Sequence, residues 1–140
     1  MVSYSFQPCF VQPILDGTKR QTIRADRRRH ARPGEELQLF TGMRTKHCKL
    51  IAQRTCKDVL PIRLVFDDAA GGEGVLLPGF GIPGGLEGFA RSDGFSSWAE
   101  MKAFWRKHHP GVDEFEGVLI TWDVARAALQ DRGPSDRDGG

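Results

Sequence analysis

One segment of this chain has the clear pattern of an amphipathic helix, and it stands among segments that alternate like short strands. Ser97 is followed three residues later by Glu100, a spacing typical of an N-terminal capping box. The apolar residues that follow recur at helical spacing, which predicts a face packed against the core. They are Trp98, Met101, Phe104 and Trp105. Pro110 and Gly111 end this helix, so most of the chain must fold by other means.

Strand-like segments hold most of the remaining apolar residues. We expect strands beginning near Thr22, around Leu37 and Leu39, and at 46–57, 59–66 and 115–122, with short hairpin arms or an ordered loop at 75–77 and 80–82. A brief helix at 10–15 is expected to stop at Gly17. This order predicts a mixed α/β, mainly β fold, in the form of a small closed or half-closed barrel with helices at its ends.

The bulk properties fit a single small domain. A length of 140 residues suffices for one hydrophobic core. No apolar run approaches the ~20 residues of a membrane helix, and the first residues do not resemble a signal peptide. We therefore expect a cytoplasmic protein without membrane contact. The segment 126–140 is too polar to join a core and is expected to be a disordered tail.

Positive charge is concentrated in one part of the chain, although the formal net charge is only +2. Residues 17–57 hold 12 Lys and Arg against 3 Asp and Glu, whereas residues 58–140 hold 8 against 14. A basic region attracts polyanions, nucleic acid first, by counterion release. The alternative is a solvated loop that confers solubility. Phosphate binding and solubility are both possible roles for the part of this region with the highest density of charge, Arg27, Arg28 and Arg29 with His30.

Lys19, Thr22 and Arg24 are the first candidates for a site. On a strand, Thr22 and Arg24 share a face because they are two residues apart. Arginine can fork a phosphate, lysine adds a point charge and threonine donates a hydroxyl, which together favour anion binding. Threonine can instead act as a nucleophile if a lysine of lowered pKa takes its proton. A purely structural role is the third possibility.

Four further residues are candidates for contact with the same ligand. They are Phe40, Arg44, Lys46 and Thr121. Arg44 and Lys46 stand near a strand start with similar orientation, where they can contact phosphate. Phe40 can stack a base, although its position in the strand pattern also fits the core. Thr121, on the last strand, either lines a cleft or faces solvent.

The histidines and cysteines lack the spacing of metal ligands, so we expect no metal site and no cofactor. The residues concerned are Cys9, Cys48, Cys56, His47, His108 and His109. The three cysteines include no C-x-x-C pair, and reduced thiols are expected. At the end of the predicted helix, His108 and His109 are expected to contact its last carbonyl groups.

Four segments, taken in order, resemble the ASCH domain of the PUA-like superfamily. They are ILDGTKRQTIR, PGEELQLFTGMRTKHCKLI, FARSDGFSSWAEMKAFW and FEGVLITW, and the first carries the signature G-x-K-x-x-T-I-R. The resemblance covers most of residues 6–123. It implies one domain at 1–125, a small PUA-like β-barrel flanked by two or three helices, with the basic signature in a cleft between barrel and helices. The glycine-rich segment 69–85 looks like an insertion loop relative to compact members.

The resemblance also implies a role related to RNA. Relatives bind RNA or read modified bases, and others act as ribonucleases or deacetylate N4-acetylcytidine. The deacetylating branch uses a lysine and a threonine that match Lys19 and Thr22, with a glutamate before the amphipathic helix. That position is Gly94 here, and the nearest carboxylates are Asp93 and Glu87.

The sequence therefore predicts a protein that holds RNA or a nucleotide-type ligand in a basic cleft. The predicted binding residues are Lys19, Arg24, Phe40, Arg44, Lys46 and Thr121. The alternative is a hydrolase, either an amidohydrolase that uses Lys19, Thr22 and Asp93 or a metal-assisted ribonuclease. A third possibility is an interaction module whose glycine-rich segment docks a protein partner.

Overall fold

The computed structural model describes residues 1–26, 29–66, 72–77, 79, 81–82 and 84–124. Some of the predicted features lie outside the described residues. These are Arg27 and Arg28 of the arginine run, parts of the glycine-rich segment including Phe80, and the tail 126–140.

The described chain is mainly β, with six strands, a short 3₁₀ helix and three α-helices. The elements in order are β1 (Val2–Phe6), η1 (Pro8–Phe10), α1 (Val11–Leu15), β2 (Gln21–Arg24), β3 (Glu36–Thr41), β4 (Lys49–Val65), β5 (Gly74–Leu76), α2 (Gly85–Ser92), α3 (Trp98–His108) and β6 (Glu114–Trp122). The sheet has the order β1-β3-β4-β6-β2, and β5 pairs with β4. The predicted mixed, mainly β class is confirmed. Strand pairing leaves the sheet open, with β1 and β2 at its two ends.

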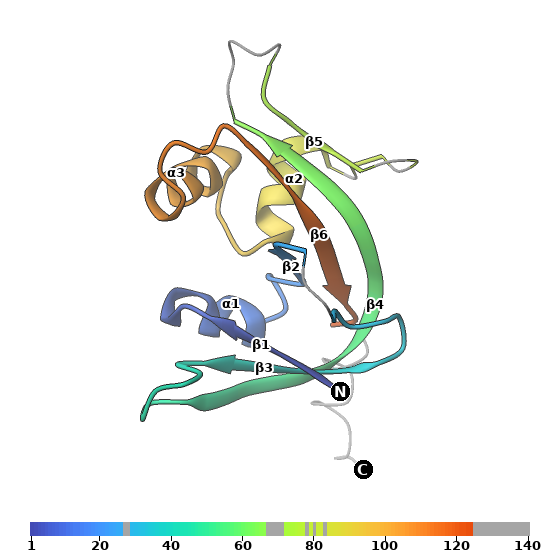
Figure 1. The fold of residues 1–140 in the computed structure, drawn as a ribbon, viewed down its shortest axis with the longest axis vertical. Coiled ribbons are helices and arrows are strands. Elements are labelled where there is room, and N and C mark those ends of the chain that lie inside the picture. Colours follow the sequence, from blue (N-terminus) through green and yellow to red (C-terminus); the bar gives the residue numbers. More distant parts are fainter. Residues whose placement is uncertain (27–28, 67–71, 78, 80, 83, 125–140) are drawn as a thin grey trace.

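Strand β4 is the longest element and joins the two halves of the sheet (Figure 1). Its first part pairs with β3 and its second part with β6. The sequence predicted two strands separated near Asp58, and that prediction is wrong. The register against β6 shifts between Cys56 and Asp58, so the chain bulges there and continues as one strand of 17 residues.

Two elements were not predicted. Strand β1 pairs in parallel with β3, with Val2 opposite Leu37, a partner far away in sequence. Helix α2 follows Gly84 and contains two glycines, which lowers its helix propensity. It is stabilised instead by burial of Phe89 and Ala90 and by packing against α3.

Helix α3 has the predicted N-terminal cap. The Ser97 hydroxyl accepts a hydrogen bond from the backbone N–H of Glu100 at 3.1 Å, and the Glu100 carboxylate accepts one from the N–H of Ser96 at 2.8 Å. The predicted apolar face is also confirmed, since Trp98, Met101 and Trp105 are buried. In the described part of the chain, no helix has both the length and the apolar character needed to cross a membrane.

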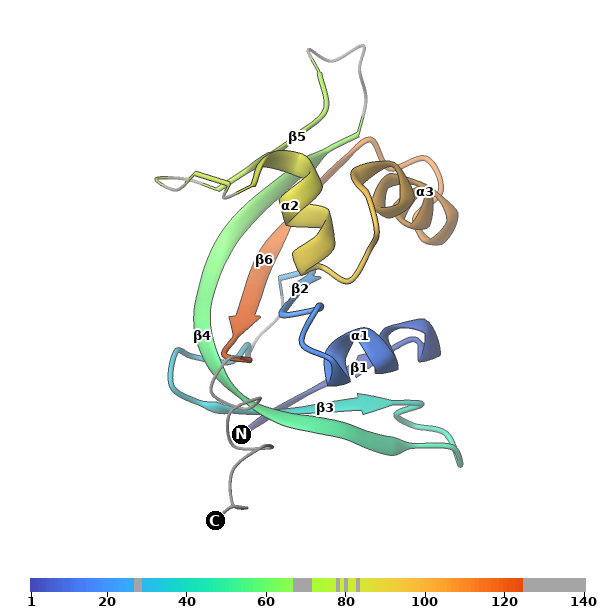
Figure 2. The ribbon, with the colours of Figure 1, turned by 180° about the vertical axis from the view of Figure 1, so that it is seen from behind.

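All three α-helices lie on the concave side of the curved β4 (Figures 1 and 2). The core fills the space between them and the sheet. Two rings of α3 pack on Phe66, the residue that follows β4, with the centroids of Trp98 and Trp105 at 5.6 and 5.8 Å from that of Phe66. This arrangement brings the C-terminal end of α3 close to β1 and β2, the strands at the ends of the sheet.

Candidate functional site between the sheet ends and helix α3

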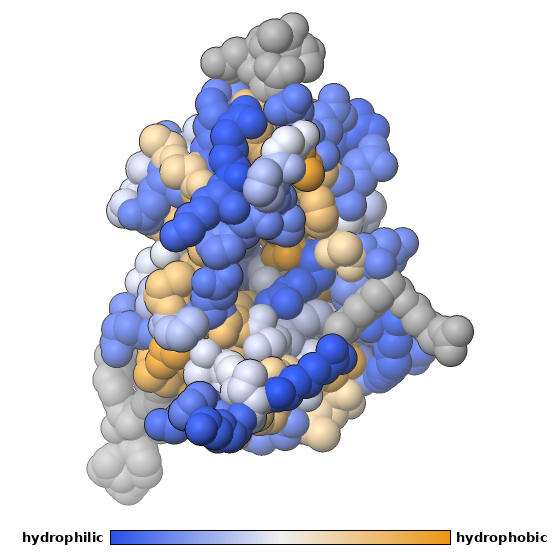
Figure 3. Space-filling view, turned by 60° about the vertical axis from the view of Figure 1, so that its left-hand side comes forward, coloured by the Kyte–Doolittle hydropathy of each residue, from blue (hydrophilic) through white to orange (hydrophobic). Residues whose placement is uncertain are grey.

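A pocket of about 310 Å³ lies between β1, β2 and the C-terminal end of α3. Its volume is at the lower end of the range for small-molecule sites. Six lining residues carry phenyl or indole rings, namely Phe6, Phe10, Phe95, Phe104, Trp105 and Phe115. Seen from this side, the molecule is hollowed between the part that holds α3 and the part that holds α1 and β3, and both hydrophobic and hydrophilic residues surround the hollow (Figure 3).

Lys19 lies in this pocket with a side chain that is only 3% exposed. Its Nζ donates a hydrogen bond to the backbone carbonyl of Asp93 at 2.7 Å and lies 3.8 Å from the carboxylate oxygen Oδ1. The ammonium also stands 4.4 Å from the ring centroid of Phe10, a cation–π contact. Burial lowers the pKa of Lys19 from its ordinary value, and the negative charge of Asp93 acts in the opposite direction.

Asp93 is the carboxylate of the pocket. It follows α2, and burial raises its pKa, while the positive charge of Lys19 opposes that rise. Its Oδ1 also accepts a hydrogen bond from the Gln21 side chain at 3.3 Å. Glu87, the other carboxylate considered from the sequence, accepts a hydrogen bond from the backbone N–H of Trp98 at 3.0 Å and is not among the pocket residues. Of these two acids, Asp93 is therefore the one available to a bound molecule.

Gly94, the residue after Asp93, has a backbone conformation and surroundings that disfavour a side chain at this position. Its φ is +99°, a conformation that disfavours any residue with a side chain. A Cβ there would stand 3.1 Å from Cδ of Lys19 and 3.2 Å from the ring of Phe10. A side chain at this position would therefore press against Lys19 and Phe10, and the carboxylate that lines the pocket comes from the preceding residue, Asp93.

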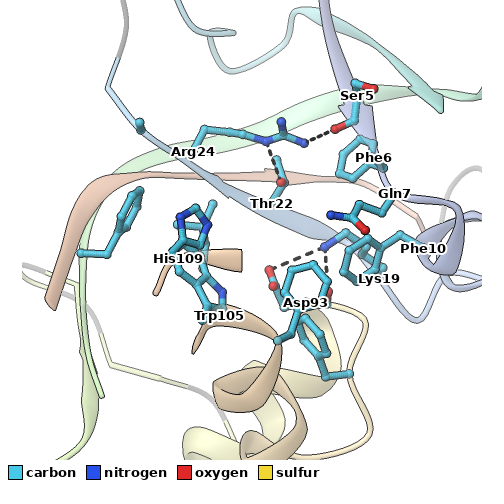
Figure 4. Close-up of a pocket in the computed structure, with 15 residues that line it drawn as sticks. Ser5, Phe6, Gln7, Phe10, Lys19, Thr22, Arg24, Asp93, Trp105 and His109 are labelled. Carbon is cyan, nitrogen blue, oxygen red and sulfur yellow. Dashed lines mark hydrogen bonds and ion pairs between the residues drawn. The ribbon is translucent and has the colours of Figure 1, made fainter. Parts of the chain in front are cut away.

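Thr22 and Arg24 lie on one face of β2, as predicted from their spacing. Arg24 Nε donates a hydrogen bond to the Thr22 hydroxyl at 3.0 Å, and its Nη2 donates one to the backbone carbonyl of Ser5 at 2.7 Å. The guanidinium stands 4.9 Å from the ring centroid of Phe6. Arg24 thus links β2 to β1 across the open side of the sheet, and its orientation is set by the protein itself (Figure 4).

The structure brings together Lys19, Thr22, Arg24 and Asp93, while other candidates lie outside the pocket lining. Phe40 is half-buried on β3, in register with Ser5 on one side and Leu50 on the other. The Thr121 hydroxyl accepts a hydrogen bond from the backbone N–H of Asp58 at 3.0 Å, at the bulge of β4.

The remaining basic candidates also lie outside the pocket lining. Arg44 and Lys46 are exposed in the turn between β3 and β4. Arg29, in the described part of the arginine run, pairs with Glu35, which also binds the N-terminal ammonium at 2.9 Å. These residues belong to the outer surface, so the basic region does not converge on one cavity.

His109 is a pocket residue that the sequence did not indicate. Its ring stacks on Trp105, with centroids 4.6 Å apart, and it faces Phe6 and Gln7 across the pocket (Figure 4). His108 packs on Phe104 with its ring tilted, at a centroid distance of 4.3 Å. The two histidines were expected to contact the last carbonyls of the helix, but their rings lie on aromatic neighbours four residues earlier. That i, i+4 spacing is the signal that could have revealed the contact.

Within the described ranges, no three His, Cys, Asp or Glu side chains gather into a metal-binding group. Comparison with known proteins found no family model, no curated protein and no solved structure that matches this chain. The chemistry of the pocket residues is therefore the basis for a functional proposal.

Proposed function

We propose that this chain is an ASCH-type, PUA-like domain that binds a nucleotide unit of RNA or a free nucleotide in the pocket. The observation that carries the proposal is that Lys19, Thr22 and Arg24, all from the sequence signature, line one aromatic pocket. In this proposal, Arg24 completes a PUA-like barrel with its side chain, across the gap that strand pairing leaves between β1 and β2.

The lining matches the two chemical parts of a nucleotide. Lining rings that are not fully buried, such as those of His109 and Phe115, can stack against a base, a contact that tolerates every base type. The charged lining residues are Lys19 and Arg24 against Asp93. Because Lys19 and Asp93 offset one another, the net positive charge comes from Arg24. A guanidinium held in a fixed orientation suits a phosphate or the acceptor edge of a base.

Binding can be tested by titrating the protein with nucleoside monophosphates and short single-stranded RNA at low salt. Calorimetry would report affinity, and intrinsic fluorescence would report on the three tryptophans together. We expect saturable binding that His109→Ala weakens and that Arg24→Lys weakens by roughly ten-fold, because lysine loses the fork geometry. Arg20→Lys is the matched control, since Arg20 is exposed and does not line this pocket. A wild-type protein that binds none of these ligands would overturn the proposal.

A second candidate function is amide hydrolysis, favoured by the presence of the Thr22 hydroxyl and the buried amine of Lys19 in one pocket. The Thr22 oxygen would attack the acyl carbon, the C–N bond would break as the amine leaves with a proton, and water would then release the acyl group. A neutral Lys19 would take the hydroxyl proton. In the structure, Lys19 donates to Asp93, so it must turn toward Thr22 first.

Deacetylation of N4-acetylcytidine tests this second function. Turnover by the wild type that survives Thr22→Ser but is lost in Thr22→Val, and in Lys19→Met under conditions where circular dichroism shows that variant to be folded, would support it. Absence of turnover by the wild type would exclude the amidohydrolase and leave the binding proposal intact.

A further inference from the structure

The turn between β3 and β4 is rich in positive charge. Arg44 and Lys46 are exposed there, Lys49 is exposed at the start of β4, and no Asp or Glu occurs in the sequence between Glu36 and Asp58. Phosphate is the group that such a surface attracts most strongly, because each contact releases a condensed counterion.

This turn is an ordered structure with its own hydrogen bonds. The Thr45 hydroxyl donates to the carbonyl of Gly42 at 2.6 Å and accepts from the N–H of His47 at 3.0 Å. A Cβ on Gly42 would stand 2.8 Å from the carbonyl oxygen of His47, so the chain folds back closely on itself. The turn therefore holds its cations on a defined backbone.

Arg44 occupies an unfavourable backbone conformation. Its φ is +68°, the only positive value among the described residues other than glycine. Glycine adopts this conformation without strain, whereas a residue with a Cβ is disfavoured there. Arg44 thus occupies a position whose backbone conformation a glycine would adopt at lower energy.

The turn adjoins the pocket through Ser5. The Ser5 carbonyl accepts the hydrogen bond from Arg24 at 2.7 Å, and the Ser5 hydroxyl accepts one from the N–H of Met43 at 3.4 Å. Thr41, at the end of β3, donates to the carbonyl of Phe6 at 2.9 Å. Phe6 and Ser5 line the pocket, and Met43 directly precedes Arg44. Ser5 therefore contacts both Arg24 of the pocket and the turn that carries Arg44.

We propose that this turn, residues 42–49, is a contact surface for the phosphate backbone of a single-stranded nucleic acid of which one nucleotide occupies the pocket. The inference rests on the proposed function and specifies its ligand as a polymer. Ser5 joins Arg24 of the pocket to the turn that carries Arg44 and Lys46, so a strand that leaves the pocket on this side would meet these cations. Arg44 and Lys46 are accordingly binding residues, at a surface separate from the pocket.

The test compares a nucleoside monophosphate with short single-stranded RNA and DNA oligomers, for the wild type, Arg44→Gly and Arg44→Gly/Lys46→Ala. Arg91→Ala is the control, because Arg91 is exposed on α2, in the opposite half of the molecule from the β3–β4 turn (Figure 2). Arg44→Gly removes the charge and relieves the backbone, so its melting temperature should equal or exceed that of the wild type. Any loss of affinity is then not a loss of folding.

We expect the wild type to bind oligomers more tightly than the monophosphate. Each cation removed from the turn should lower oligomer affinity by about five-fold in about 0.1 M salt and reduce the slope of log K against log salt by about 0.7. Affinity for the monophosphate should not change. The RNA and DNA arms decide whether both nucleic acids or only one is held.

Oligomers that bind no better than the monophosphate, or turn variants that behave like Arg91→Ala, would overturn the inference and leave the pocket proposal standing. If no nucleotide of any length binds, the proposed function itself fails, and this inference fails with it.

Discussion

The ammonium group of Lys19 donates a hydrogen bond to the backbone carbonyl of Asp93, 74 residues further along the chain. This contact joins the entry to β2 with the connection between α2 and α3. Gln21 adds a second link to the Asp93 carboxylate. Two distant segments thereby build one wall of the pocket, and its shape depends on a buried pair of opposite charges.

Loss of one partner of this pair should cost more stability than loss of both. Lys19→Met leaves the Asp93 carboxylate buried without its cation, which should lower the free energy of unfolding by about 3–5 kcal/mol. The double variant Lys19→Met/Asp93→Asn removes both charges and should be more stable than Lys19→Met alone. Denaturant titrations of the wild type, both single variants and the double variant give the coupling energy. Additive effects of the two substitutions would contradict the structural pairing.

The pH dependence of stability should reveal which ionisation state the pocket favours. Burial raises the pKa of Asp93 above its ordinary 3.8 and lowers the pKa of Lys19 below its ordinary 10.5. The native state therefore holds the Asp93 proton more tightly than the unfolded chain does, and stability falls as pH rises from about 3.8 through the native pKa. It holds the Lys19 proton less tightly, so stability rises again as pH increases from the native pKa of Lys19 toward 10.5.

Both effects can be isolated as a difference between proteins. The free energy of unfolding of the wild type minus that of Lys19→Met/Asp93→Asn should be smallest at intermediate pH and larger toward both extremes. A difference that is largest near neutral pH would mean that the attraction between the two charges outweighs their burial, contrary to this prediction.

The parts of the fold that follow from local patterns could be predicted from the sequence. The cap of α3 requires only Ser97 and Glu100, and the shared face of Thr22 and Arg24 requires only strand geometry. Strand β1 was missed because its pairing with β3 spans 35 positions, as between Val2 and Leu37. Such a strand is stabilised by a distant partner rather than by its own composition.

The candidate site was predictable to a similar extent. Lys19, Thr22 and Arg24 lie close together in sequence, and the structure places them in one pocket. Arg44 and Lys46 were assigned to the same ligand from their charge and their place near a strand start, which do not show where a side chain points, and they lie on a separate turn. The role of Asp93 could not follow from pattern, because its contact with Lys19 depends on how α2 packs, and α2 has weak local signals.

The three cysteines should differ sharply in reactivity. Cys9 and Cys48 are exposed, whereas Cys56 is buried beside the bulge of β4. Burial, together with the negative charges of Asp58 and Glu35, raises the pKa of Cys56 from 9.0 to about 11, which lowers its thiolate fraction roughly hundred-fold. Mass spectrometry after iodoacetamide treatment at mildly alkaline pH should find two thiols modified quickly and Cys56 only in denaturant. Rapid labelling of Cys56 in the folded protein would contradict its position in the core.

Gly94 offers the most direct test of how the pocket wall is packed. Gly94→Ala places a side chain at a φ of +99° and 3.1 Å from Cδ of Lys19, so both backbone strain and overpacking oppose it. We expect a loss of roughly 2–4 kcal/mol in the free energy of unfolding. Gly34→Ala is the matched control, because Gly34 has a φ of +89° with no atom within 4 Å of the added Cβ. It should cost only the conformational part, about 1 kcal/mol.

The difference between these two alanine variants measures the steric contact with Lys19 and Phe10. If the contact is real, replacing Lys19 by a smaller side chain should reduce the cost of Gly94→Ala and leave that of Gly34→Ala unchanged. Equal costs for the two glycine substitutions would show that Gly94 is needed for its backbone conformation alone. A glutamate at position 94 would then be excluded by backbone strain and not by the presence of Lys19.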